Sequence, residues 1–270
     1  MLVLTIMNTV ARFLFVTAAA CAWPVLAQSQ SRAQGDLHAA EDIGIPGLRL
    51  LDTRHADQRL SLLGIRLGYV EQDVRLGETG KYFCAALTSD QAVTAAGPVS
   101  SGIARLPYTT VYRMGLRYVI LCSDVKAGDR GIGGFPVPPL NLLMLDVGIG
   151  SQAGWLESTV LHELYHMAEL RINALVDGDW EQQFTGYANA YAPNLGRGDI
   201  GSGAAGFVNA YSQTFPYEER AELFSELLVH PDEVVAHIRA TNDEVLRRKI
   251  RYMDDKARTL LGLKLAPLGL

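Results

Sequence analysis

The residues best suited to chemistry form one motif, His162-Glu163-Leu164-Tyr165-His166, which has the pattern HExxH. In an α-helix, residues four positions apart share a face, so both imidazoles can bind one metal ion. The carboxylate of Glu163 then lies beside the site, where it can accept a proton from a water molecule. The motif therefore predicts zinc on His162 and His166, with Glu163 as the general base. The structural alternative is a helix that carries two surface histidines.

A catalytic zinc site needs a third protein ligand and an open position. The motif does not continue as HExxHxxGxxH, because the glycine and the third histidine are missing, and the metzincin pattern is excluded. A later segment supplies three carboxylates instead, those of Glu218, Glu219 and Glu222. Glu218 and Glu222 lie one helical turn apart, so one can bind metal while the other accepts a hydrogen bond from a ligand histidine. A solvated acidic helix face would have the same pattern.

HELYH followed by a distal ExxxE helix resembles the gluzincins, in particular the compact zinc peptidases related to the catalytic domain of anthrax lethal factor. That family has a tyrosine ahead of its ligand glutamate, in a segment that runs into Glu-x-x-Ala-Glu-x-Phe. The matching segment here starts at Tyr211 and reads YSQTFPYEERAELF. The resemblance covers about residues 150–228. It implies that Glu218 binds zinc, that Glu222 supports a ligand histidine, and that Tyr211 donates to the oxyanion. The choice among the three glutamates stays open.

The elements that must position these residues follow from hydrophobic periodicity. Apolar residues spaced three and four apart predict a helix over 153–174, which carries the motif. Further helices are expected over 56–76, over 217–229, from Pro231, and from a capping box at Thr241 to about Leu261. Strands are expected over 81–88, 109–125 and 141–147, a loop over 127–139, and a long irregular segment over 176–210.

This order of elements predicts an α+β fold rather than alternating βαβ units. We expect one compact, zincin-like domain over 46–270, in which a small, twisted mixed sheet from residues 80–150 packs against the HExxH helix. Further helices should follow at the C-terminal end. The edge strand of the sheet is expected to bind an extended peptide through main-chain hydrogen bonds. Residues 28–45 are small and polar, and predict a flexible segment.

The first 27 residues have the pattern of a signal peptide, with an apolar run after Arg12 and small or apolar residues up to Ala27. A retained membrane anchor is the alternative, but the run is short for a span and Pro24 interrupts it. No other stretch of about 18 apolar residues occurs, so we expect no stable membrane span after cleavage. These features predict export to the periplasm or out of the cell.

Two cysteines, Cys84 and Cys122, would remain after cleavage. In an oxidising compartment they can form one disulfide, and two separate buried thiols are the alternative. The formal net charge is −5 and no long basic run occurs, which argues against a nucleic-acid partner.

Several other patterns carry little weight. Residues 201–206 spell GxGxxG but follow no predicted strand, so the phosphate-binding geometry is missing. Arg197 opens an Arg-Gly-Asp tripeptide, which is too short to indicate a function. The four remaining histidines are scattered and are expected to be surface or core residues: His38, His55, His230 and His237.

The sequence thus predicts an exported peptidase with one Zn²⁺ per chain and a peptide or protein substrate. One alternative is a non-catalytic, zinc-containing envelope or secreted binding protein, although a purely structural site has no need of Glu163. Another is a metal-free interaction protein in which the motif is accidental. Neither the substrate nor the oligomeric state follows from the sequence.

Overall fold

The computed structural model of this chain describes residues 43–52, 58–77, 80–148, 154–172, 175, 178–184, 191–192 and 196–265. The expected signal peptide and most of the expected flexible segment lie outside these residues. None of the helices in the described part of the chain is long and apolar enough to span a membrane.

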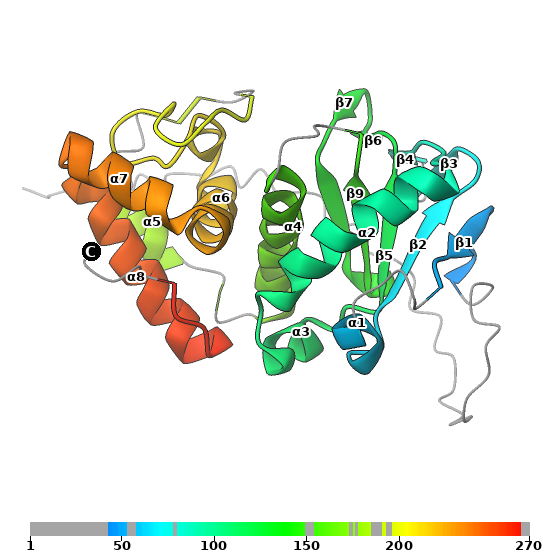
Figure 1. The fold of residues 1–270 in the computed structure, drawn as a ribbon. Coiled ribbons are helices and arrows are strands. Elements are labelled where there is room, and N and C mark those ends of the chain that lie inside the picture. The colour runs from blue at the N-terminus through cyan, green and yellow to red at the C-terminus, as the bar shows by residue number, and fades with distance from the viewer. Residues whose placement is uncertain are drawn as a thin grey trace, which may run out of the picture. The chain divides into compact units, whose positions relative to one another are not determined.

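A five-stranded mixed sheet forms the centre of the fold, with strand order β1-β2-β5-β9-β8 (Figure 1). Its three inner strands are parallel, whereas both edge strands run antiparallel to their neighbours. The strands are β1 (Leu48–Leu50), β2 (Arg66–Val70), β5 (Tyr118–Cys122), β9 (Leu142–Asp146) and β8 (Gly134–Val137).

Both faces of this sheet are covered, which explains why β5 and β9 are continuous apolar runs. Alternate side chains such as Val119 and Leu121 belong to the main core, which the helices complete, and Ile120 and Cys122 face the opposite side. A second, antiparallel sheet covers that side in the order β3-β4-β6-β7. Its strands are β3 (Val74–Leu76), β4 (Tyr82–Cys84), β6 (Val125–Ala127) and β7 (Arg130–Gly131).

A disulfide between Cys84 on β4 and Cys122 on β5 joins the two sheets. Both cysteines are fully buried. Of the two states that the sequence leaves open, the structure therefore has the disulfide.

Helix α4 lies between the sheet with α2 on one side and the C-terminal helices on the other (Figure 1). It packs against α2, the edge strand β8 and α6, so most of its surface is buried. The long helices are α2 (Ser89–Ala104), α4 (Trp155–Arg171), α6 (Pro216–Val229), α7 (Pro231–Thr241) and α8 (Glu244–Leu261). The short ones are α1 (Gln58–Leu62), α3 (Tyr108–Met114) and α5 (Gly178–Phe184), with 3₁₀ turns η2 (Pro138–Leu140) and η5 (Tyr211–Gln213).

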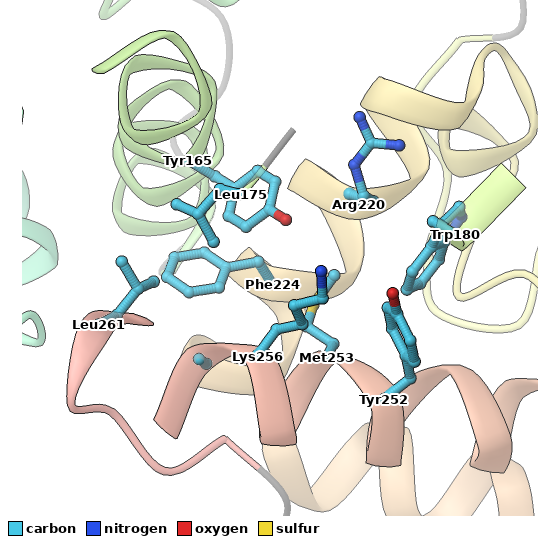
Figure 2. Close-up of a pocket in the computed structure, with 10 residues that line it drawn as sticks. Tyr165, Leu175, Trp180, Arg220, Phe224, Tyr252, Met253, Lys256 and Leu261 are labelled. Carbon is cyan, nitrogen blue, oxygen red and sulfur yellow. The ribbon is translucent and has the colours of Figure 1, made fainter. Parts of the chain in front are cut away.

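A narrow pocket of about 10 Å³ lies among α4, α5, α6 and α8, with Trp180 and Tyr252 in its wall (Figure 2). This volume is at the lower limit for a single water molecule, so the pocket belongs to the packing of the helices.

The α+β prediction is confirmed, as are the expected helices over 153–174 and 217–229, the helix from Pro231 and the strand over 141–147. The helix predicted over 56–76 is wrong beyond Leu62. Gly64, at φ 66°, turns the chain into β2, where Leu67 and Val70 face opposite sides of the sheet.

Three other predictions are wrong in part. Residues 109–114 belong to α3 rather than to a strand, and 178–184 of the expected irregular segment form α5. The last helix is capped by Asp243 rather than by Thr241, since the Asp243 carboxylate accepts from the N–H groups of Val245 and Leu246. Helix α2 is absent from the expected elements, although Thr88 and Gln91 form a capping box at its start.

The loop predicted over 127–139 is also wrong, because it contains β7 and β8. Gly134 and Pro136 favour a loop in the sequence, although both lie in strand β8. Asp146 donates its N–H to the carbonyl of Gly133, so the alternation of an antiparallel pair turns the main-chain groups of Gly134 and Pro136 away from β9. In the described sheet β8 is an edge strand, where a proline is tolerated.

Candidate metal centre

Helices α4 and α6 bring together the three side chains predicted to bind metal. The Nε2 atoms of His162 and His166 lie 3.0 Å apart. Oε2 of Glu218 is 3.0 Å from the first nitrogen and 3.4 Å from the second. One turn of α4 thus supplies both imidazoles, and the first turn of α6 supplies the carboxylate.

These spacings suit zinc. Ligand atoms about 2.0 to 2.1 Å from a tetrahedral ion are separated by roughly 3.3 Å. The three distances, 3.0, 3.0 and 3.4 Å, all lie near this value. Two nitrogens and one oxygen are also a usual donor set for catalytic zinc. The residues present therefore fit the ion that the motif predicts.

The other two glutamates of α6 are engaged elsewhere. Oε1 of Glu222 lies 2.8 Å from Nδ1 of His162, on the far side of the ring from the donor cluster. Glu219 points away from the cluster and pairs with the ammonium group of Lys249, which is fully buried. Of the three candidates, the structure places only Glu218 among the donors, with Glu222 behind a histidine.

Glu219 also accepts hydrogen bonds from the indole of Trp180 and the hydroxyl of Tyr191, and Lys249 donates to the carbonyl of Gly206 at 2.9 Å. This buried group ties the start of α6 to α5, to α8 and to the segment that precedes η5. These contacts fix the position of the first turn of α6, which carries Glu218.

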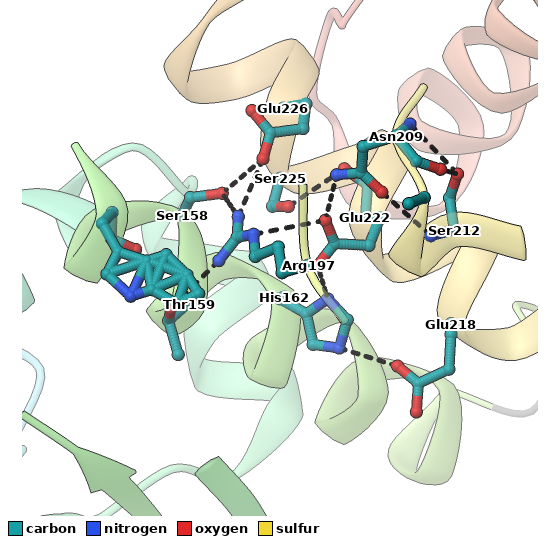
Figure 3. A network of polar contacts seen from close by, with 12 residues as sticks. Ser158, Thr159, His162, Arg197, Asn209, Ser212, Glu218, Glu222, Ser225 and Glu226 are labelled. Carbon is teal, nitrogen blue, oxygen red and sulfur yellow. Dashed lines mark hydrogen bonds and ion pairs between the residues drawn. The ribbon is translucent and has the colours of Figure 1, made fainter. Parts of the chain in front are cut away.

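A guanidinium group completes the environment of Glu222 (Figure 3). Nε of Arg197 lies 3.4 Å from Glu222, and its other nitrogens contact Glu226 on α6 and both Ser158 and Thr159 on α4. The same guanidinium stacks on the ring of Trp155 at 4.1 Å. Arg197 therefore holds α4 and α6 together one turn away from the donor cluster.

Asn209 donates from its amide nitrogen to the second carboxylate oxygen of Glu222 (Figure 3). Ser212 in turn donates its N–H to the side chain of Asn209 at 2.9 Å. These contacts satisfy Glu222 on all sides, as expected for a carboxylate that orients a ligand histidine.

His166 has a carboxylate behind it as well. Its Nδ1 lies 3.9 Å from Glu169 on the next turn of α4, and Glu169 accepts a 2.6 Å hydrogen bond from Arg220. Each histidine of the motif thus has one carboxylate near Nδ1 and shares Glu218 near Nε2.

The electrostatics of the site call for positive charge between the imidazoles. Burial would lower the pKa of His162, but Glu218 and Glu222 outweigh this effect and raise the pKa to about 10. Burial opposes ionisation of both glutamates. Nevertheless the histidines hold the pKa of Glu218 far below its usual range, and Arg197, His162 and Asn209 bring the pKa of Glu222 to about 2. Two ionised carboxylates therefore face the histidines, and a divalent cation would supply the charge that protons supply here.

Glu163 and Tyr211 share a cleft of about 380 Å³ with His162. Burial raises the pKa of Glu163. Burial, together with the charges of Glu218 and Glu163, also raises the pKa of Tyr211, so its hydroxyl keeps its proton. The ring of Tyr211 is centred 5.9 Å from that of His162. All the residues that the sequence singles out for the site therefore lie in or beside one cleft.

The edge strand approaches Glu163 closely. A Cβ atom added at Gly134 would lie 2.7 Å from Cγ of Glu163 and 2.8 Å from the carbonyl oxygen of Met144. A Cβ at Gly133 would lie 3.2 Å from Thr159 on the same helix. The two glycines thus allow β8 to lie directly against α4.

Sequence reasoning missed several residues of the site. These are Arg197, Asn209 and Glu226. No local pattern identifies them, because they act through contacts between segments far apart in the sequence. Glu169 could have been found, because it follows His166 by three positions and so shares its helix face.

Comparisons with known proteins show the fold. No protein-family model matches the chain, and no curated protein matches its sequence. Its structure is similar to the crystal structure of a protein from Bacteroides caccae named as a putative zinc-binding metallo-peptidase. The TM-score is 0.51 at 13% sequence identity, and the match covers 76% of this chain and 83% of the other. This likeness confirms the expected zincin-like fold.

Proposed function

We propose that this protein is a zinc-dependent peptidase that acts outside the cytoplasm. The observation that carries the proposal is the spacing of His162, His166 and Glu218, which suits one zinc ion, beside a buried carboxylate and an open cleft. The fold shared with the Bacteroides caccae protein supports it. The narrower resemblance to the catalytic domain of anthrax lethal factor stays a prediction.

In the proposed mechanism, His162, His166 and Glu218 would hold the ion, and zinc would make a water molecule more acidic and polarise the peptide carbonyl. Glu163 accepts a proton from the attacking water and later passes it to the leaving amine. Its raised pKa suits this return of the proton. Tyr211 donates its hydroxyl proton in a hydrogen bond to the developing oxyanion.

The edge strand supports a peptide substrate. The main-chain groups of Gly134 face the open edge of the described sheet directly above Glu163. A peptide added to this edge as a further strand would bring one of its carbonyl groups close to the donor cluster.

The proposed location rests on the signal-peptide pattern of residues 1–27 and is supported by the disulfide between Cys84 and Cys122, because disulfides persist in oxidising compartments.

The first test is metal content, measured by mass spectrometry on purified protein. We expect about one zinc per chain, with loss of zinc in His162→Ala. His230→Ala is the matched control, since this histidine pairs with Glu233 outside the cluster. A wild-type protein that binds no zinc even after reconstitution would refute the proposal.

The second test is Glu163→Gln, which should keep zinc and lose about 10²- to 10⁴-fold in peptide hydrolysis. A protein that binds zinc, cleaves no peptide in a broad library and captures a partner would instead be the non-catalytic binding protein that the sequence leaves as an alternative.

A further inference from the structure

The cleft contains two arginines with different surroundings. The guanidinium nitrogens of Arg197 already have partners within the protein, since they contact Glu222, Glu226, Ser158 and Thr159. Arg130, on β7, is exposed. Among the residues that the structure describes, no carboxylate forms an ion pair with its guanidinium, and this includes the adjacent Asp129.

Arg130 nevertheless lies close enough to act on the site. It lines the same cleft as His162, Glu163 and Tyr211. The exposed guanidinium of Arg130 therefore belongs to the cleft that contains the motif and the proposed oxyanion donor.

The rest of the cleft wall is unfavourable to a substrate carboxylate. Glu163 and Glu222 line the cleft and would repel a second negative charge, while Trp155 and Ile132 offer apolar surface. The donors of Arg197 are already used. Among the described side chains that line the cleft, Arg130 is thus the one that can bind a carboxylate of a peptide, because its planar guanidinium can donate two parallel hydrogen bonds.

Building on the proposed peptidase function, we infer that Arg130 determines specificity by binding a carboxylate of the peptide substrate near the bond that is cleaved. The carboxylate belongs either to an acidic side chain or to the C-terminus of the peptide. Both sources present the same chemistry to the guanidinium, and an experiment can separate them.

The test measures binding first, so that it does not depend on turnover. Zinc-loaded Glu163→Gln protein is titrated with matched fluorescent peptides that differ only in Glu against Gln at one scanned position, or in a free against an amidated C-terminus. We expect about 5-fold tighter binding of one carboxylate-bearing series, the upper range for a charge-assisted contact at an exposed position. The series that shows the preference identifies the source.

Adding Arg130→Ala should reduce this ratio to about one, and Arg130→Glu should reverse it in favour of the neutral member of each pair. Lys126→Ala is the matched control. It removes a positive charge from the neighbouring strand β6, where Lys126 pairs with Asp124, and should keep the ratio. Equal affinity for both members of every pair, or a ratio that survives in Arg130→Ala, overturns the inference.

Hydrolysis by protein with an intact Glu163 separates the two proposals. If acidic or free-acid peptides bind preferentially through Arg130 but none is cleaved, the peptidase proposal fails while the carboxylate site stands. If peptides are cleaved and Arg130→Ala slows carboxylate-bearing and neutral ones by the same factor, Arg130 acts on the reaction in general and the selectivity inference fails.

Discussion

Gly134→Ala tests whether the contact between strand β8 and the buried carboxylate matters for both stability and chemistry. The new methyl group would lie 2.7 Å from Cγ of Glu163 and 2.8 Å from the backbone oxygen of Met144. Backbone cannot yield without disturbing the β8–β9 pair, so the strand or the glutamate must move. Such overpacking costs about 1 to 3 kcal/mol. For a domain of this size that is a fall in Tm of roughly 2 to 12 °C.

We expect Gly134→Ala to lower kcat/KM without lowering the zinc content. The three atoms nearest to a Cβ at Gly134 belong to Glu163, Met144 and Leu145 and to none of the three donors, so zinc content should stay at the wild-type level. A shift of Glu163 by about 1 Å can lower the rate by about 100-fold. The assay therefore compares Tm, zinc content and kcat/KM for Gly134→Ala.

Gly131→Ala is the control for Tm, since a Cβ at Gly131 meets nothing within 4 Å. A Gly134→Ala protein with wild-type Tm and wild-type kcat/KM would refute the described approach of β8 to α4.

Three further predictions concern the surroundings of the site. Glu222→Gln should weaken zinc affinity by about 10- to 100-fold in competition with a chelator, because it removes the carboxylate behind a ligand histidine; unchanged affinity would contradict this role. Lys249→Met should lower the free energy of unfolding by about 3 to 5 kcal/mol in urea titrations, since Glu219 would be left buried without its partner. Adding Glu219→Gln should recover part of the loss, and strictly additive losses would argue against the pair. Replacing Cys84 and Cys122, which are 38 residues apart, by serine should cost about 4 kcal/mol in the same assay, and an unaltered denaturation midpoint would count against the disulfide.

The centre of the site could be predicted because its information is local. His162 and His166 are one helical turn apart, and the apolar residues around them have helical spacing, so motif and helix support each other. Glu218 needed more than local pattern. Three glutamates occupy five positions of α6, and only the packing of that helix separates them, since Glu219 turns towards Lys249 and Glu222 towards the back of His162.

The edge of the sheet could not be predicted because its residues serve tertiary contacts at the expense of local propensity. Gly134 is small because Glu163 lies against it, and glycine together with proline is typical of loops. The role of Arg197 also depends on tertiary contacts, because its partners lie on α4 and α6 about 30 to 40 residues away in the sequence. Helix α3 contains Thr110 and Val111, whose β-branched side chains favour a strand. In the fold, Thr110 instead donates to the carbonyl of Leu261 in α8.

The proline in β8 has a consequence for contacts between copies of the chain. Pro136 faces the open edge and has no N–H, so the edge offers the donor of Gly134 but none two residues further along. A long strand from another molecule could not form a continuous ladder of main-chain hydrogen bonds with this edge, because the ladder would be interrupted at Pro136. A short ligand needs only the groups around Gly134. Pro136 thus leaves the edge accessible to short peptides and disfavours fibril-like self-association.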